Sequence, residues 1–320
     1  MAQRDRKSKE TAVDFVSLIL EDTSGQRSVF NGGLSASRAR RSLSLNPYNW
    51  ATSNETGPTV GYDQETSFPS FSQWDGANFR VARLEKARKA LRSLEEWYAT
   101  LLEKDSDISV YKNFDRRVFF NSQLIYLIAA TDDSENNVGH SQFVASYALL
   151  LARAMGIEDE NFLVDLERGA LLHDIGKVGL PSSVLRKETP LTLLERAIIK
   201  EHPLLGYLLL QDYAFLAGAS EVVLYHHEWY DGQGYPFGLK GEEIPLAARI
   251  FSLADTLDAI TSDRPYRRGQ CFEVALKEII KGSGTQFDPS VVDVFLSIPQ
   301  ERWERARSEA LRTFRLPLIH

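Results

Sequence analysis

Helical periodicity dominates the chain from about residue 77 onward and constrains the fold more than any other feature. Apolar residues recur at spacings of three and four, and Gly, Pro, Asp and Asn interrupt the pattern. Strands do not alternate with helices, and neither GxGxxG nor GxxxxGK[ST] occurs. Dinucleotide-binding and P-loop folds are therefore excluded, and an all-α bundle is predicted. After residue 106 we expect helices near 115–130, 140–155, 162–175, 191–201, 204–217, 219–228, 246–262, 271–281, 289–297 and 300–312.

The chain divides into three parts by composition. Residues 1–76 include a Ser-rich stretch without periodicity, which predicts a loop-rich, partly irregular region of unknown role. Residues 77–105 predict a long amphipathic connecting helix, and residues 106–320 form the main helical domain. One face of the connecting helix is an apolar seam of Leu84, Ala87, Leu91, Leu94, Tyr98 and Leu101. Such a seam serves either packing on the same chain or a homodimer, and both alternatives stay open.

Composition narrows the classes of protein that this chain can represent. Its 320 residues carry a net charge of −7 without a block of Lys and Arg, which argues against polymeric nucleic acid as a partner. No signal-peptide core follows the charged start, and no apolar run approaches the ~18 residues of a membrane span. The single cysteine, Cys271, excludes disulfide frameworks and zinc sites built on paired cysteines. We therefore expect a cytoplasmic protein that holds any metal with His and carboxylates.

Five of the six histidines lie between residues 140 and 227, which predicts a common site. His173 and Asp174 follow an apolar helical run near a helix end, and the adjacent pair 226–227 ends another such run. His202 precedes a proline at the boundary between two expected helices. The candidate metal ligands are His140, His173, Asp174, His202, His226, His227 and Asp255.

Asp255 lies within an apolar helical segment, with Asp258 one turn further on. A buried carboxylate is costly unless it is paired, and either a metal ion or an arginine such as Arg249 would pair it. Five His and two Asp give seven ligands, more than one ion normally uses, so two ions bridged by Asp174 fit the count better. Ligation by imidazole and carboxylate without sulfur favours Fe or Mn over Zn.

Taken together, these motifs resemble the HD-GYP family, a branch of the HD metal-dependent phosphohydrolases. The resemblance covers roughly residues 115–297 and rests on His140, HDIGK (173–177), His202, HHE-x-x-DG-x-GYP (226–236), Asp255 and SDRPYR (262–267). It implies an all-helical HD-type bundle with two or three metals. It also implies hydrolysis of cyclic di-GMP to pGpG and, in many members, GMP, by attack of a metal-bound hydroxide on phosphorus.

The resemblance also implies roles for individual residues. Asp174 and Lys177 match catalytic positions, and Lys177 matches the lysine that reaches the scissile phosphate. The remaining substrate contacts that it implies are Gly234, Tyr235, Pro236, Arg264 and Arg267. Lys187 matches a family lysine to which we assign no role, and a surface salt bridge is the alternative.

Two positions depart from the family pattern. Members with a third metal carry a Glu four residues before the first His, and this chain has Asn136 there. Glu135 is an additional candidate ligand, but the departure favours two ions over three. Position 229 is usually basic in the family, whereas Trp229 would either stack on a guanine or pack on the neighbouring helix.

Other functions remain as alternatives to hydrolysis of cyclic di-GMP. The first is a non-hydrolysing cyclic di-GMP sensor or a docking module for a diguanylate cyclase or another signalling protein. The second is an HD hydrolase of another nucleotide. Every expected His and Asp is present, which favours the enzyme. Metal identity, the end product and the signal read by the N-terminal region stay open.

Overall fold

The structure, a computed structural model, describes residues 77–103, 121, 124, 139–263 and 267–313. The predicted N-terminal region, most of the helix expected at 115–130, and Glu135, Asn136 and Arg264 lie outside the described residues. Within the described residues all regular secondary structure is helical, and the only β-type pairings are two isolated bridges. The prediction of an all-α fold is confirmed.

Most expected helices are present with shifts of a few residues at their ends. Thr192 and Glu195 form a reciprocal capping box, and Asp159 and Asp288 cap two other helices with their side chains, as short polar residues do at helix starts. The connecting helix is α2 (Ala77–Glu103). The others are α4 (His140–Ala154), α5 (Glu160–Leu172), α6 (Ser182–Leu185), α7 (Leu193–Ile199), α8 (His202–Leu210), α9 (Ala217–Tyr225), α10 (Leu246–Thr261), α11 (Phe272–Lys281), α12 (Pro289–Ser297) and α13 (Gln300–Thr313), with 3-10 turns η4 (Ile175–Gly179), η5 (Ala214–Leu216) and η6 (Gly241–Glu243).

The continuous helix expected at 204–217 is wrong. Helix α8 ends at Leu210, and a turn separates it from η5. Tyr213 takes an extended backbone conformation there and buries its ring, while its hydroxyl donates to the carbonyl of Arg88 in α2 at 3.1 Å. A contact with a distant helix thus ends α8 where the local pattern has no Gly or Pro.

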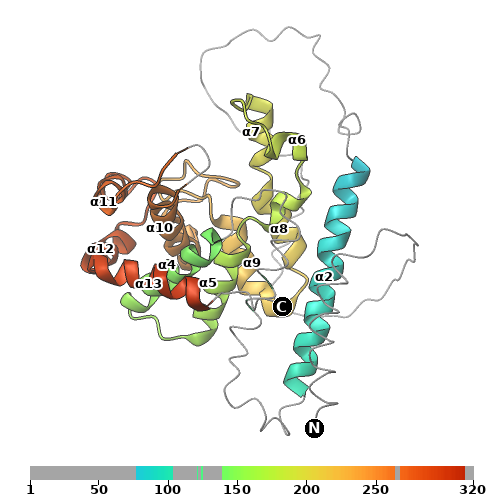
Figure 1. The fold of residues 1–320 in the computed structure, drawn as a ribbon, viewed down its shortest axis with the longest axis horizontal. Coiled ribbons are helices and arrows are strands. Elements are labelled where there is room, and N and C mark those ends of the chain that lie inside the picture. The colour runs from blue at the N-terminus through green and yellow to red at the C-terminus, as the bar shows by residue number, and fades with distance from the viewer. Residues whose placement is uncertain (1–76, 104–120, 122–123, 125–138, 264–266, 314–320) are drawn as a thin grey trace. The chain divides into compact units, whose positions relative to one another are not determined.

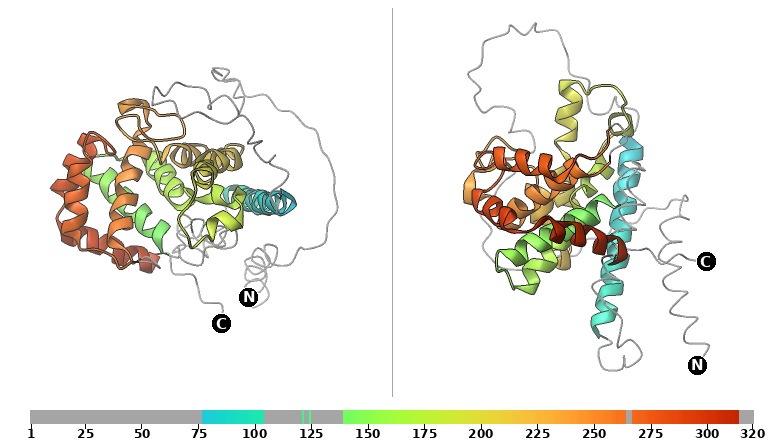
Figure 2. Two further views of the ribbon diagram at one scale, coloured as in Figure 1. Left: turned by 90° about the horizontal axis from the view of Figure 1, so that it is seen from above. Right: turned by 60° about the vertical axis from the view of Figure 1, so that its left-hand side comes forward.

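The buried apolar residues form two cores. The first core joins α4, α5 and α10–α13 around large side chains such as Phe251 and Trp303. The second core joins α2, η4, α8 and α9, with Leu172 and Leu210 fully buried. Figures 1 and 2 show α11–α13 on one side of α4 and α10, and α2 and α8 on the other. Helices α5 and α9 contribute residues to both cores, and α9 contacts α5, α8 and α10.

Helix α2 packs its apolar seam on its own domain. Ala87, Leu91 and Leu94 are buried in the second core, and the helix contacts η4 directly. Tyr98 and Leu101 lie where no side chain is described. For the described part of the seam the structure favours intrachain packing, and a homodimer through this helix stays a prediction.

Replacing Leu91 with alanine should lower the free energy of unfolding by about 2–5 kcal/mol, because it opens a cavity at a side chain that is 0% exposed. Denaturant unfolding followed by circular dichroism measures the change. Val81→Ala is the control on the same helix, since Val81 is 53% exposed, and a shift within about 0.5 kcal/mol is expected there. Equal stability losses for the two variants would contradict the packing of α2 on the domain.

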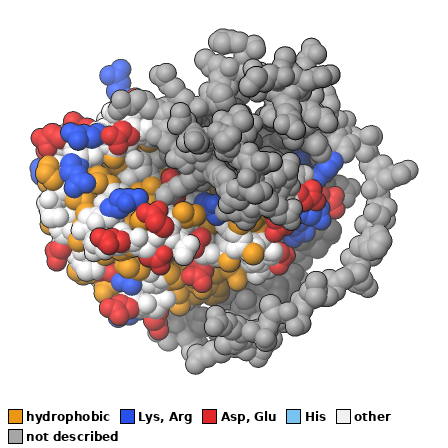
Figure 3. All heavy atoms as spheres, turned by 90° about the horizontal axis from the view of Figure 1, so that it is seen from below, with side chains coloured by type: hydrophobic (Ala, Val, Ile, Leu, Met, Phe, Trp, Pro, Cys, Tyr) orange, Lys and Arg blue, Asp and Glu red, His pale blue; other side chains and the backbone are white. Residues whose placement is uncertain are grey.

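The distribution of surface charge and the hydropathy of the helices bear on whether nucleic acid or a membrane is a partner. On the face drawn in Figure 3, Lys and Arg side chains of the described residues lie among Asp and Glu rather than in one basic stripe. None of the described helices contains a run that is long and apolar enough to cross a bilayer.

Candidate metal centre

Six of the seven predicted metal ligands lie at helix ends. His173 caps the C-terminus of α5 and Asp174 follows it, while His202 is the first residue of α8. His226 caps the C-terminus of α9, next to His227. His140 begins α4, and Asp255 alone lies inside a helix, α10. The structure therefore brings together all seven residues from five different helices.

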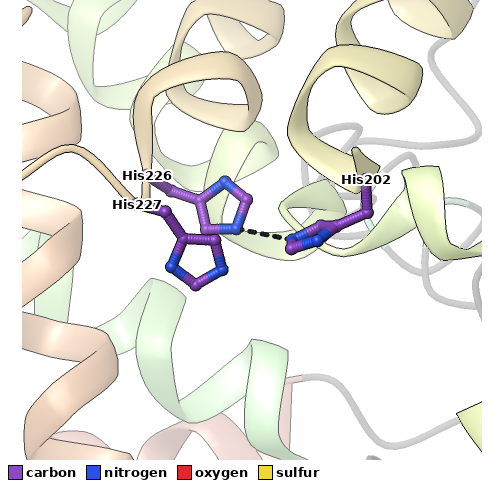
Figure 4. Close-up of side chains that lie close together, drawn as sticks. All are labelled: His202, His226 and His227. Atoms are coloured by element: carbon purple, nitrogen blue, oxygen red, sulfur yellow. Dashed lines mark hydrogen bonds between the residues drawn. The ribbon is translucent and has the colours of Figure 1, made fainter. Parts of the chain in front are cut away.

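The ligands form two groups, each with its ligand atoms within 4.8 Å of one another. The first group is His202, His226 and His227, which Figure 4 shows converging from α8 and the end of α9. The second group is His140, His173 and Asp255. The two groups adjoin, since the rings of His173 and His226 are 5.5 Å apart. Each group offers three ligand atoms to one ion.

Asp174 lies between the two groups and faces both. Its Oδ1 is 3.3 Å from Nε2 of His202 in the first group, and its Oδ2 is 3.2 Å from Nε2 of His173 in the second. Its side chain is 16% exposed. One carboxylate with an oxygen toward each group is the arrangement that a bridging ligand requires.

The histidine tautomers leave lone pairs directed into the site. His173, His202 and His226 each present Nδ1 to the backbone carbonyl three residues earlier, at 2.9, 2.7 and 2.7 Å. A carbonyl can only accept, so Nδ1 carries the proton in each neutral ring and Nε2 carries a lone pair. The Nε2 atoms of His202 and His226 approach to 3.1 Å (Figure 4). Two facing lone pairs repel, and a cation between the ligands would remove that repulsion.

Electrostatics keep the first group neutral. Burial lowers the pKa of His202 to about 4 and that of His227 to about 3, and burial with the neighbouring rings holds the pKa of His226 well below its usual value. These rings are unprotonated at neutral pH and can donate to a metal.

The carboxylates of Asp174 and Asp255 are charged, whereas the rings of the first group are neutral. Burial raises the pKa of Asp174, but Lys177 and the neighbouring histidines outweigh it and hold that pKa well below its usual range. Burial also lowers the pKa of His140, but the carboxylates of Asp255 and Asp258 outweigh it and raise the pKa to about 9. Burial also raises the pKa of Asp255, but its hydrogen bond with His140 and the nearby histidines outweigh it and lower that pKa. Asp174 and Asp255 are thus both ionised and supply negative charge for cations.

The residues fit a pair of divalent ions. The neutral imidazoles of the first group, the ionised carboxylates and the facing lone pairs form a donor set of N and O atoms without sulfur, as Fe, Mn and Zn accept. His140 would join this set when a cation displaces the proton from its Nε2. The first group would hold one ion, the second group the other, and Asp174 both. A third ion depends on Glu135, which lies outside the described residues.

The loop that contains Gly234, Tyr235 and Pro236 packs directly on the first group. The Tyr235 ring stacks on His227 with centroids 4.6 Å apart, and its backbone N–H donates to the His227 carbonyl. A Cβ on Gly234 would lie 2.2 Å from the backbone nitrogen of Trp229, so only glycine permits this approach. The carboxylate of Glu228, buried beneath the loop, accepts the backbone N–H groups of Phe237 and Leu239.

The predicted basic residues have individual surroundings. Lys177 donates to Oδ2 of Asp174, the carboxylate that faces both groups, at 2.5 Å. Lys187 forms a salt bridge with Glu195, the alternative that the sequence left open. Arg267 donates to the carbonyls of Ala259 and Ile260 and so caps the end of α10.

Other details settle or extend the sequence analysis. Arg249 pairs with Asp288, not with Asp255. Trp229 is 38% exposed, which leaves both of its interpretations open.

The sequence analysis gave no role to Glu228 or Asp258. Glu228 lies within the motif that begins at His226, and Asp258 lies one turn after the predicted ligand Asp255. The burial of their charged side chains indicates a role, but this burial is known only from the folded structure.

Comparison with known proteins supports a common family. A model of the HD domain family matches residues 124–291. A cyclic di-GMP phosphodiesterase of Thermotoga maritima is 35% identical over 65% of this chain and 56% of its own length. The cyclic di-GMP phosphodiesterase response regulator RpfG of Xanthomonas campestris is 43% identical over 46% of this chain and 39% of its own. The 3′3′-cGAMP-specific phosphodiesterase 2 of Vibrio cholerae is 33% identical over 58% of this chain and 35% of its own.

This chain thus spans between about a third and somewhat more than half of the length of these relatives. The family match nonetheless includes both groups of ligands, Asp174 and the GYP loop.

Proposed function

Because this chain belongs to the HD domain family, we propose that it is a metal-dependent phosphodiesterase that hydrolyses cyclic di-GMP. Hydrolysis adds water to one phosphodiester, breaks its P–O3′ bond and gives linear pGpG; a second water, added to the remaining diester of pGpG, would give two molecules of GMP. The proposal includes two ions, of Fe or Mn, because the donor set contains N and O atoms but no sulfur. It also includes a cytoplasmic location, because a chain with a single cysteine suits a reducing compartment.

The position of Asp174 is the observation that carries this proposal. A single buried carboxylate with one oxygen 3.3 Å from His202 and the other 3.2 Å from His173 joins two complete sets of ligand atoms. Bound in these groups, two divalent cations would polarise the phosphoryl oxygens and lower the pKa of the attacking water. A sensor has no need for a linked pair of this kind.

The chain's own residues orient the substrate and balance its charge. Lys177 stands beside Asp174 and offers a fixed positive charge to the phosphoryl oxygens, on which negative charge grows during the reaction. Arg264 and Arg267 contact the dinucleotide. To do so, Arg267 gives up its hydrogen bonds to the carbonyls at the end of α10 and donates instead to a phosphate or a guanine edge. The Tyr235 ring, stacked on His227, holds the loop against the first group.

To test the proposal, the full chain is purified anaerobically and analysed for metals. It is then incubated separately with cyclic di-GMP and with 3′3′-cGAMP. Anion-exchange chromatography then identifies the products. We expect two ions per chain and conversion of cyclic di-GMP to pGpG. Two bound ions without turnover would favour the sensor, and faster turnover of 3′3′-cGAMP would change the assigned substrate.

Lys177→Met should lower kcat by about 10²–10³ while both ions stay bound, because it removes charge stabilisation from the transition state and no metal ligand. Steady-state kinetics and metal analysis of one preparation measure both effects. Lys187→Met is the matched control, since it removes a lysine that pairs with Glu195 outside the ligand groups. Unchanged kcat in Lys177→Met would refute the role of this lysine.

A further inference from the structure

His140 differs from the other ligands in the partner of its Nδ1. His173, His202 and His226 lie at or just after the end of a helix, where backbone carbonyls lack helical partners and accept Nδ1–H. His202 begins α8 as well, but it follows closely on α7, whose last carbonyl, that of Ile199, accepts from it. His140 begins α4, and the described hydrogen bonds join its Nδ1 to a side chain instead of a backbone carbonyl. Its Nδ1 lies 2.6 Å from Oδ2 of Asp258 on α10.

Asp258 is held on every side. Its side chain is 0% exposed, and its second oxygen, Oδ1, accepts from Ser262 Oγ at 2.6 Å and from Arg307 at 3.2 Å. Arg307, on α13, also donates to Ser262 Oγ and stacks its guanidinium on the ring of Phe143, 4.1 Å from the centroid. A buried carboxylate needs such partners, because it is otherwise strongly destabilising. The Asp258 carboxylate is therefore fixed in position and cannot turn away from His140.

We infer that Asp258 is the positioning residue of His140 in the second group. By accepting a hydrogen bond from Nδ1–H, it leaves Nε2 as the ligand atom, directs that atom toward Asp255 Oδ1, which lies 3.2 Å away, and makes the imidazole a stronger donor. The inference deepens the proposed function and rests on its metal site. It also makes α13 part of the support of that site through Arg307, which lies beyond residue 291, where the family match ends.

The geometry predicts that the two ions respond differently to a change at Asp258. The first group, His202, His226 and His227, has no contact with this carboxylate among the described hydrogen bonds and ion pairs, so its ion should be retained. Loss of the partner of a ligating histidine typically weakens metal binding by about 10–100-fold. Only the ion of the second group should therefore bind more weakly.

The test is Asp258→Asn in the full chain. Metal-free protein is titrated with Mn²⁺ by isothermal titration calorimetry. We expect one Mn²⁺ per chain to bind as in the wild type and the other about 10–100-fold more weakly. Two Mn²⁺ bound with wild-type affinities would overturn the inference and leave the proposed function standing. A wild type that binds no Mn²⁺, Fe²⁺ or Zn²⁺ would overturn both.

Asp288→Asn is the matched control. Asp288 is also a buried carboxylate paired with an arginine, Arg249, but it contacts none of the ligands. This variant should lose stability and keep both affinities. If Asp258→Asn fails to fold, Ser262→Ala replaces it: removal of the hydroxyl that donates to Oδ1 should weaken the same ion a few-fold, and wild-type affinities would overturn the inference.

Discussion

Asp174→Ala should lose both metal ions and essentially all turnover. The carboxylate faces a histidine of each group, so its removal takes one ligand from each ion at once. We expect kcat to fall by at least about 10³, or about 4 kcal/mol in activation free energy. Metal analysis after gel filtration and product chromatography measure the two effects.

Asp165→Ala provides the control, because Asp165 lies on α5, the helix that leads to the site, but belongs to neither ligand group. It should keep both ions and its activity. Asp174→Asn separates shape from charge: it retains the side-chain volume, and we expect it to lose metal nearly as completely as alanine does. Retention of two ions in Asp174→Ala would contradict the bridging role and with it the central observation behind the proposed function.

Gly176→Ala should cost about 3 kcal/mol or more of stability and weaken metal binding as well. A Cβ at this position would lie 1.9 Å from the carbonyl oxygen of His202 and 2.5 Å from the backbone nitrogen of Gly206. Backbone atoms cannot rotate away as side chains do, so η4 and α8 would have to separate. Asp174 directly precedes η4 and His202 begins α8, and the ligand atoms of these two residues are 3.3 Å apart. Thermal unfolding and Mn²⁺ titration measure the two effects.

Gly179→Ala is the matched control within the same 3-10 turn. Its added Cβ would meet the far end of the Leu205 side chain at 3.1 Å, which can move by a change of rotamer. We expect a smaller loss of stability and unchanged metal binding. If the two variants behaved alike, the contact between η4 and α8 would not be what sets the distance between Asp174 and His202.

Local sequence was sufficient for most of the fold. The apolar period and the capping residues predict α4, α10, α11 and α12 to within a few residues of their observed ends. The exception, the helix expected at 204–217, fails because Tyr213 leaves the helical conformation to bury its ring against α2. A pattern that records only neighbours in the chain contains no information about a partner such as Arg88 on another helix.

For the site, residue types and motifs predicted the candidate ligands but not their arrangement. The clustering of the histidines and the family resemblance gave the seven candidate ligands, five His and two Asp. The number of donors then suggested two ions bridged by Asp174. The roles of Asp258 and Glu228 were missed. Their function follows from what they contact, His140 for Asp258 and the loop backbone for Glu228, and no spacing rule predicts those contacts.

The sequence by itself determined the all-α class, the helices that carry the ligands and the chemistry of the donor set, because these depend on local periodicity and residue type. Only the tertiary structure decided which atoms face each other. It placed one oxygen of Asp174 toward each group, and it set the tautomers through carbonyls at helix ends. It also joined His140 to an aspartate 118 positions away. These features arise from packing between helices that are distant in the chain, where burial makes each unpaired polar atom costly and so selects one arrangement.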